Sequence, residues 1–491
     1  MKLPARIIAC IALASCGLMP AVTTATASAA TAAGAGHAAA VSKGAPLGSQ
    51  ATAGTQAAGG TMLWAALYKG SNGTGQATAI AASPDGSRVF VTGLNGDSPP
   101  HEFYGTVAYN PVTGARLWTA SYRSPAGANL ASAIAVSPDG SKVFVTGASA
   151  GGYATVAYAA ATGAMLWTAR YSGPAGGATP AAVAVSPDGS TVFVTGNAAT
   201  TGSGLAYATV AYAAATGATL WTASYGIAGG ISVADSLAVS PDGSTVFVTG
   251  IASETSGVRG WATIAYAAAT GAQLWVARYN GPVDKGGVAR SVAVSPDGST
   301  VVVTGSATQA SGAGYATLAY AAATGATRWT ALYNGPFGAG PDTSAYSVAV
   351  SPDGSKVFIT GASEASSTEA LTAYATVAYD AATGATLWVA RYNGPAEQSS
   401  AVQLVVSPDG SQVFVTGSTV KVFGNLGEYQ YATVAYSTVT GGTLWLRLYP
   451  NSDSGGSATG IAESPDGSKV FVTGATARPS AQYGTVAYST G

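Results

Sequence analysis

The tetrapeptide Ser-Pro-Asp-Gly occurs eight times in this chain of 491 residues, and its spacing restricts the possible folds more than any other feature. Consecutive copies begin 49 to 57 residues apart. A period of roughly 50 residues is typical of a propeller or a solenoid, in which each repeat is one unit of supersecondary structure. The copies begin at Ser83, Ser137, Ser186, Ser240, Ser295, Ser351, Ser407 and Ser464.

Each repeat contains four short runs rich in Val, Tyr, Phe, Trp or Thr, and these runs predict four β-strands. In Ser-Pro-Asp-Gly, the proline presets φ and the glycine ends a type I turn between the first two strands. A Thr-Gly pair such as Thr162-Gly163 marks the turn between the third and fourth strands. In the second repeat the runs span residues 132–137, 142–146, 153–158 and 165–171.

The two ends of the repeat region predict how the ring closes. The sequence finishes with a third strand, Tyr483 to Tyr488, whereas Thr61 to Tyr68 reads as a fourth strand with no preceding three. Joining the two segments completes one unit and removes an unpaired strand edge. We therefore predict an all-β protein, an eight-bladed β-propeller of four-stranded antiparallel blades over residues 61–491, closed by its N-terminal strand.

The first 60 residues have a different composition. Lys2 and Arg6 precede the apolar run Ile7 to Ser15, and Ala27-Ser28-Ala29 offers a cleavage site, so residues 1–29 are typical of a signal peptide. Residues 30–60 are mainly Ala, Gly, Ser and Thr, which indicates a flexible linker. We expect a secreted, extracellular protein. The alternative is a lipid anchor on Cys16, because Leu13-Ala14-Ser15-Cys16 resembles a bacterial lipobox.

The residue inventory disfavours several kinds of chemistry. Both cysteines, Cys10 and Cys16, lie in the expected signal peptide, and the two histidines are His37 in the linker and His101 in a loop. Eight of the 14 aspartates belong to Ser-Pro-Asp-Gly turns, where the turn explains them. A net charge of −1 gives no electrostatic footprint for nucleic acid. We expect no metal site, no bound cofactor, no transmembrane segment and a monomeric chain.

A tryptophan lies in the fourth strand of every unit, and we assign these residues a structural role between adjacent blades. In the second repeat, Trp167 and Tyr171 share one face of the strand, with the small Ala169 between them. The eight residues are Trp64, Trp118, Trp167, Trp221, Trp275, Trp329, Trp388 and Trp445.

Two segments of the repeat resemble known bacterial propellers across residues 61–491. The stretch from Ala378 to Trp388, Ala-Tyr-Asp-Ala-Ala-Thr-Gly-Ala-Thr-Leu-Trp, resembles the tryptophan-docking repeat of pyrroloquinoline-quinone-type (PQQ-like) propellers. The half Ser-Pro-Asp-Gly-x-x-Val-Phe-Val-Thr-Gly resembles the surface-layer repeat of the Tyr-Val-Thr-Asn type. Quinone dehydrogenases of the first group use a vicinal cysteine pair and a carboxylate–calcium site. This chain lacks the pair, so it looks more like the non-enzymatic scaffolds of that group.

Aligning the first strands on Ser-Pro-Asp-Gly brings out a candidate ligand site. One equivalent position holds Asp235, Arg290 and Tyr346 in blades four, five and six, and small residues or valine in the other five blades. An acid, a base and an aromatic ring side by side at the mouth of the channel could hold a polar ligand. The alternative is a salt bridge that fixes neighbouring blades. Asp284, Lys285 and Asp342 lie in the loops before these strands and would extend the site.

These features favour a secreted, non-catalytic propeller that binds or organises an extracellular protein or glycan. Loops between the second and third strands, and between blades, vary most among repeats, so a binding surface should lie on their face. The main alternative is a propeller enzyme, either a quinone-type oxidoreductase or a lyase or hydrolase; another is a structural wall component. Glu463 replaces a repeated valine, and we expect either a buried carboxylate with a raised pKa or one facing a wet channel.

Overall fold

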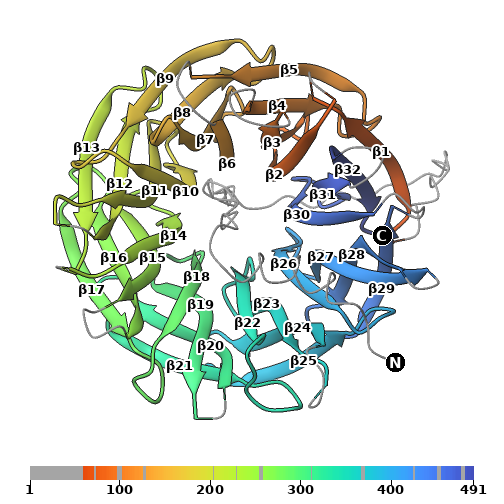
Figure 1. Ribbon diagram of the computed structural model, residues 1–491. Coiled ribbons are helices and arrows are strands. Elements are labelled where there is room, and N and C mark those ends of the chain that lie inside the picture. The colour runs from red at the N-terminus through yellow and green to blue at the C-terminus, as the bar shows by residue number, and fades with distance from the viewer. Residues whose placement is uncertain are drawn as a thin grey trace, which may run out of the picture.

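The computed structural model describes residues 59–491 except 71–72, 97–101, 125–128, 203, 228, 254–257, 311, 367–370, 424–425, 451–454 and 477–480. The expected signal peptide, nearly all of the expected linker, Cys16 and both histidines lie outside the described residues. The described part is built from 32 strands arranged as eight four-stranded sheets. These sheets form the blades of a propeller around a central channel (Figure 1).

Blades 1 to 4 each use four strands that are consecutive in the sequence, and the first strand lies nearest the channel. Their bounds are β2 (Gly75–Ala82), β3 (Val89–Asn95), β4 (Phe103–Tyr109), β5 (Arg116–Tyr122); β6 (Asn129–Val136), β7 (Lys142–Ser149), β8 (Gly152–Ala159), β9 (Met165–Tyr171); β10 (Ala178–Val185), β11 (Thr191–Ala199), β12 (Leu205–Ala213), β13 (Thr219–Tyr225); β14 (Ser232–Val239), β15 (Thr245–Ser253), β16 (Arg259–Ala267) and β17 (Gln273–Tyr279).

Blades 5 to 7 follow the same order, and blade 8 combines the last three strands with the first. Their bounds are β18 (Gly287–Val294), β19 (Thr300–Gln309), β20 (Gly312–Ala321), β21 (Thr327–Tyr333); β22 (Ser344–Val350), β23 (Lys356–Glu364), β24 (Thr372–Asp380), β25 (Thr386–Tyr392); β26 (Ser399–Val406), β27 (Gln412–Phe423), β28 (Leu426–Ser437), β29 (Thr443–Tyr449); and β30 (Gly456–Glu463), β31 (Lys469–Thr476), β32 (Gln482–Ser489), β1 (Met62–Tyr68).

The predicted fold class and its mode of closure are confirmed. Strand β1 pairs antiparallel with β32, in a register that runs from Met62 opposite Tyr488 to Tyr68 opposite Tyr483. The backbone N–H of Ser489 donates to the carbonyl of Thr61 at 2.9 Å, which extends this ladder at the end of the strand. The first strand of the ring thus covers the edge that β32 would otherwise expose.

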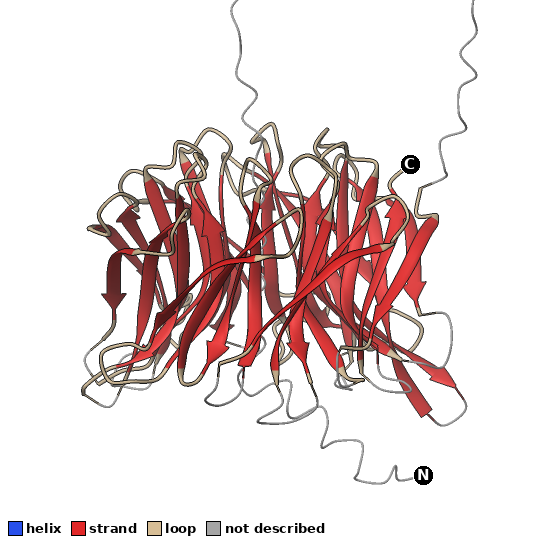
Figure 2. Ribbon diagram, turned by 90° about the horizontal axis from the view of Figure 1, so that it is seen from above, coloured by secondary structure: helices blue, strands red, loops and turns tan. Residues whose placement is uncertain are grey.

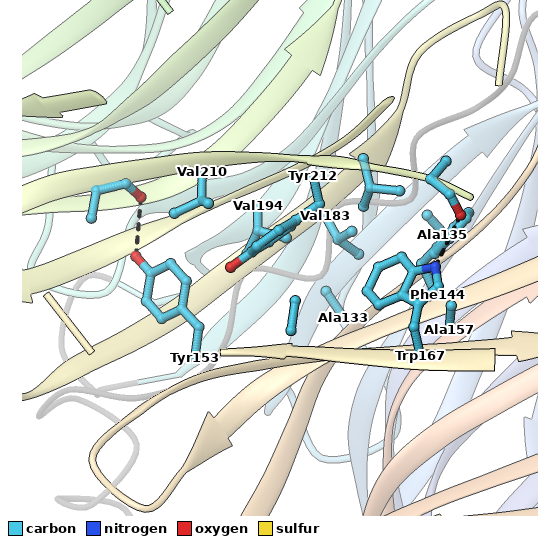
Figure 3. Close-up of a cluster of buried hydrophobic side chains, with 14 of the residues drawn as sticks. Ala133, Ala135, Phe144, Tyr153, Ala157, Trp167, Val183, Val194, Val210 and Tyr212 are labelled. Carbon is cyan, nitrogen blue, oxygen red and sulfur yellow. Dashed lines mark hydrogen bonds between the residues drawn. The ribbon is translucent and has the colours of Figure 1, made fainter. Parts of the chain in front are cut away.

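Aromatic side chains fill the space between neighbouring blades. In the cluster between blades 2 and 3, the ring centroid of Trp167 lies 5.7 Å from that of Phe144 and 6.4 Å from that of Tyr212 (Figure 3). The indole N–H of Trp167 donates to the carbonyl of Ala214 in blade 3 at 3.0 Å (Figure 3). The only polar atom of the indole ring thus forms its hydrogen bond with the neighbouring blade. The tryptophan therefore fills the space between the two blades and also links them by a hydrogen bond.

The same arrangement recurs around the whole ring. Each of the eight tryptophans of the fourth strands is at most 9% exposed and donates to a carbonyl of the next blade at 2.8 to 3.3 Å. The glycine of the Thr-Gly turn lies against this indole ring. At Gly163, φ is +72° and a Cβ atom would lie 2.6 Å from Trp118, so only glycine fits both the turn and the contact.

The Ser-Pro-Asp-Gly turns account for their own aspartates. At Asp139, the carboxylate accepts from the hydroxyl of Ser137 and from the backbone N–H of Ser141. These hydrogen bonds, with that of Ser137 the strongest, lower the pKa of Asp139 to about 2. The eight turns lie on the face that also carries the C-terminus (Figure 2). Ordered local bonding of this kind indicates that these carboxylates fix turns rather than bind ligands.

Candidate functional site in the channel wall

Every strand that lines the channel carries a β-bulge at the same repeat position. The pairing register between the first and second strands of each blade shifts at one residue, which is left without a partner in the ladder. We call these the bulge residues; from blade 1 to blade 8 they are Thr78, Ser132, Ala181, Asp235, Arg290, Tyr346, Val402 and Thr459.

The alignment therefore selected a real structural position, but its height in the channel differs from the expectation. Asp235 and Arg290 are the fourth residues of the eight-residue strands β14 and β18, and Tyr346 is the third of seven in β22. The bulge lies about halfway along each inner strand. The three residues thus belong to the wall of the channel rather than to its outer mouth, because each strand begins two or three residues earlier.

In blades 8 and 1 the bulge residue connects its blade to the next one. The hydroxyl of Thr459 donates to the carbonyl of Ala77 at 3.0 Å, and the hydroxyl of Thr78 donates to the carbonyl of Ala131 at 2.9 Å. Both acceptors are backbone groups on the inner strand of the following blade. At this position a short hydroxyl side chain thus satisfies its own donor and a buried carbonyl together.

Asp235 and Arg290 make the corresponding connection between blades 4 and 5 through charge. Nη1 of Arg290 lies 3.7 Å from Oδ2 of Asp235, which is an ion pair too long to count as a hydrogen bond. The side chain of Asp235 is 12% exposed and that of Arg290 is 36% exposed. Within the described part of the chain, Oδ2 of Asp235 and Nε of Arg290 are buried and have no hydrogen-bond partner.

Burial and charge set the protonation of this group. Burial raises the pKa of Asp235 to about 6, and the neighbouring Arg290 opposes the shift. Burial also raises the pKa of Tyr346, while the positive charge of Arg290 lowers it and the negative charge of Asp342 raises it. Arg290 lies in blade 5, between the blades that carry Asp235 and Tyr346. Tyr346 as a whole residue is 36% exposed.

The three loop residues expected to extend the site do so unequally. Asp342 is exposed in the β21–β22 loop and lies near enough to Tyr346 to influence its pKa. Asp284 and Lys285 are exposed in the β17–β18 loop, where Asp284 has a positive φ of 52°. Among the residues that the structure describes, no ion pair joins either of them to Arg290 or Asp235. The core of the candidate site is therefore the bulge triplet.

Sequence reasoning missed the position that directly follows the bulge. In blades 4 to 7 it is Ser236, Ser291, Ser347 and Gln403, whose side-chain oxygens accept from the backbone N–H groups of Val292, Val348, Leu404 and Ile461 at 3.0 to 3.3 Å. Each bond crosses to the inner strand of the next blade. The available signal was a polar residue where blades 1 to 3 have alanine.

Blade 4 departs from the other seven in a second place. In seven blades a buried tyrosine of the third strand donates its hydroxyl to a carbonyl of the next blade, as Tyr207 of blade 3 does to Ala262 at 3.1 Å. In blade 4 this residue is Trp261, whose indole N–H donates to Ser306 at 3.2 Å. The larger ring lies in the same blade as Asp235.

Glu463 is the second unusual acidic residue near the channel. It is the last residue of β30, and both of its carboxylate oxygens are buried without a hydrogen-bond partner among the described residues. Burial, followed by the nearby charges of Asp409 and Asp466, raises its pKa to about 9. Of the two expectations stated for this residue, the buried carboxylate is the one that agrees with this geometry. The described residues contain no group of three His, Cys, Asp or Glu side chains arranged to hold a metal ion.

Comparison with known proteins identifies the repeat. The family model described as outer membrane protein assembly factor BamB, which represents PQQ-like repeats, matches residues 103–208 and 206–477. These ranges include more than half of the sequence. No curated protein matches the chain at a significant level. The PQQ-like part of the resemblance is thereby supported, whereas the surface-layer part stays an expectation.

Solved propellers of two functional classes share the fold. The structure of Chaetomium thermophilum Sqt1 bound to the N-terminus of ribosomal protein L10 has a TM-score of 0.59 at 14% identity, over 87% of this chain and 98% of that one. Quinohemoprotein alcohol dehydrogenase from Comamonas testosteroni has a TM-score of 0.56 at 14% identity, over 88% and 76%. A europium-containing methanol dehydrogenase has a TM-score of 0.51 at 14% identity, over 87% of this chain and 93% of that one. At such low identity the likeness shows the fold alone.

Proposed function

We propose that this chain, which belongs to the PQQ-like propeller family described as outer membrane protein assembly factor BamB, is a non-catalytic binding module of the cell exterior. The observation that supports a binding site is the bulge triplet. Among the described residues, Oδ2 of Asp235 and Nε of Arg290 are buried there and make no hydrogen bond, although the threonine hydroxyls at the same position in blades 8 and 1 do. A buried polar group without a hydrogen bond costs about 1–3 kcal/mol, and the ring avoids this cost at the same position in blades 8 and 1.

The expected ligand is an extracellular protein segment or a glycan that enters from the face of the variable loops. The site lies in the middle of the inner strands, inside the channel. A single segment of polypeptide or the end of a glycan is narrow enough to reach it, whereas a folded domain is too wide. The Sqt1 structure, which is bound to the N-terminus of ribosomal protein L10, illustrates that this fold can bind the end of another protein. Secretion is inferred from residues 1–29 of the sequence. The described residues include no helix that is both long and apolar enough to cross a membrane.

The enzymatic alternative rests on the dehydrogenases that share the fold. The residues present do not fit the quinone chemistry that the resemblance implies, because Cys10 and Cys16 are not adjacent and lie in the expected signal peptide. We therefore assign no catalytic residue. Quinone reconstitution followed by a dye-reduction assay tests this choice: reduction above that of a heat-denatured control would favour the oxidoreductase.

Affinity capture from a cell-wall extract tests the binding function. The purified parent chain and the R290A variant serve as baits, with K356A as a control because Lys356 lies at the start of β23, beside a Ser-Pro-Asp-Gly turn. We expect the parent and K356A to retain a component that R290A loses, at closely similar melting temperatures. Equal retention by all three baits would exclude the triplet as the site, and no retention by the parent would favour a purely structural wall component.

A further inference from the structure

We infer that the hairpin of β27 and β28 in blade 7 is a docking edge for an extended segment of another protein, which pairs with β28 as an added strand. The edge consists of Gly427 and Tyr429, which precede the point where β28 begins to pair with β29. It belongs to the third strand of its blade and not to an inner strand. The inference therefore goes beyond the proposed function and does not depend on the bulge triplet.

The hairpin extends further than the corresponding hairpins of the other seven blades. Strand β28 begins at Leu426, five residues before Tyr431, which is its first residue paired with β29. In the other blades the third strand begins one to three residues before its first pair with the fourth strand. Strand β27 pairs with β28 over this whole length, from Phe423 opposite Leu426 inward. Among the described residues, the outer part of β28 thus pairs on one side only.

The pairing register determines where the backbone groups of this part point. The N–H of Val420 donates to the carbonyl of Gln398 at 2.9 Å, away from β28. Val420 lies opposite Tyr429, and opposite residues of an antiparallel pair direct their backbone groups either towards each other or both away. The N–H and C=O of Tyr429 therefore point away from β27. Those of Gly427 do the same, because the direction alternates along a strand.

In other blades the loop that leads to the next blade covers this edge. The position two residues before the first paired tyrosine is Leu205 in blade 3, and its N–H donates to the carbonyl of Gly230 at 3.4 Å. In blade 5 the position is Ala313, whose carbonyl accepts from the N–H of Gly340 at 2.9 Å. Tyr429 is the equivalent residue in blade 7. No such bond to its backbone occurs within the described part of the chain.

Blade 7 differs because the chain turns towards blade 8 as soon as β29 ends. Cδ of Pro450 lies 3.5 Å from the position that a Cβ atom on Gly456 would take. The carbonyl of Pro450 accepts from Nε2 of Gln430 at 2.6 Å, and a proline has no N–H with which to continue the ladder. The backbone groups of Gly427 and Tyr429 therefore form a short open edge. Such an edge is a template for another extended polypeptide, which matches its alternating donors and acceptors.

The side chains of the edge define the segment that fits. Tyr429 is 50% exposed and shares one face of the strand with the exposed Gly427, so an apolar residue opposite the glycine packs beside the ring. Glu428 lies between them on the other face, which favours a basic residue opposite it. Two-fold pairing with a second copy, Gly427 opposite Tyr429, would set Glu428 against Glu428 and is disfavoured. The fitting partner is a different protein with a basic residue between two apolar ones.

Fluorescence anisotropy with the peptide fluorescein-Thr-Val-Lys-Val-Thr-amide tests this edge, because its valines and lysine match that pattern. We expect saturable binding by the parent. Y429P removes an outward N–H but no bond to β27, and should weaken binding about tenfold. V422P is the matched control, since the N–H of Val422 faces the other edge of the hairpin. Y429T keeps the N–H and should weaken binding less than Y429P. A peptide with Glu in place of Lys should bind more weakly.

Hydrogen exchange of the parent locates the peptide, which should slow exchange in residues 427–431 and not in β14 or β18. G427P replaces Y429P if that variant melts at a lower temperature than the parent. Equal binding by the parent and the proline variant, or no saturable binding by the parent, would overturn the inference. Loss of binding in R290A but not in Y429P would assign the peptide to the bulge triplet instead. A dimer that Y429P converts to a monomer in sedimentation velocity would show that a second copy occupies the edge.

Discussion

The same β-bulge takes two forms on opposite sides of the channel. On the side of blades 8, 1 and 2, which we call the closure half, the bulge residues are Thr459, Thr78 and Ser132, and both threonine hydroxyls bond to the neighbouring blade. On the side of blades 4, 5 and 6, the polar half, they are Asp235, Arg290 and Tyr346, and two of their buried polar atoms make no hydrogen bond to the described residues. The backbone is alike, but the closure half joins its blades at this position through hydrogen bonds, whereas the polar half does so only through the long ion pair of Asp235 and Arg290.

This difference indicates where a repeat protein can acquire a function. In the polar half the residue after the bulge also joins the blades, because Ser236, Ser291 and Ser347 each accept a hydrogen bond from the next blade. The side chain at the bulge is then free to vary. In the closure half the residues after the bulge are Ala79, Ala133 and Gly460, which offer no side-chain hydrogen bond.

Removing the closing strand should have the largest effect. Deletion of Thr61 to Tyr68 exposes the edge of β32 and takes away Trp64, which donates to Pro111 of blade 1 at 2.9 Å. Truncating a buried aromatic residue alone typically costs about 3–5 kcal/mol. We expect aggregation in size-exclusion chromatography and a large fall in melting temperature.

The matched control changes the exposed side of the same strand. Leu67 is 57% exposed, so L67S should leave the melting temperature nearly unchanged, within the roughly 0.5 kcal/mol typical of surface changes. A deletion variant that remains monomeric and melts with the parent would show that the ring does not depend on β1.

Replacing Glu463 should stabilise the closure half. Because the pKa in the folded state is about 9 against an ordinary 4.5, folding holds a proton that the unfolded chain loses as pH rises above 4.5. One pKa unit is worth about 1.4 kcal/mol, so the cost reaches several kcal/mol at alkaline pH. E463V restores the residue of six other repeats and should raise the melting temperature at pH 8.

The pH dependence provides the control for this variant. Below pH 4.5 both states of the parent are protonated, so the advantage of E463V over the parent should shrink towards pH 4. E463Q should lie between them, since it removes the charge but keeps buried polar atoms. The same gain at pH 4 and pH 8 would contradict a buried carboxylate and indicate better packing alone.

The smallest expected effects compare the two halves directly. T78V removes the hydroxyl that bonds to Ala131 and should cost about 1 kcal/mol, measured by urea unfolding. D235A/R290A removes both partners of the long ion pair together with their unsatisfied atoms, and should leave stability unchanged or slightly raised. If the double variant loses as much stability as T78V, the pair is a structural link between blades and the functional assignment fails.

The sequence alone determined the architecture, because the fold depends on local chemistry repeated eight times. Ser-Pro-Asp-Gly and Thr-Gly can form few structures besides tight turns. The repeat region starts with a fourth strand and finishes with a third, so pairing the two leaves no strand edge exposed. The alignment also brought Asp235, Arg290 and Tyr346 to one position, since a repeat places equivalent residues at equivalent heights.

Only the tertiary structure decided what that position is. A bulge depends on pairing between two strands, so the sequence showed neither the bulge itself nor its depth in the channel. The ion pair of Asp235 with Arg290, and the lack of a hydrogen bond at Oδ2 and Nε, depend on distances across blades. The bonds from Thr78 and Ser236 to the next blade have the same origin. Contacts between residues more than 50 positions apart are set by the closed ring, which no single repeat encodes.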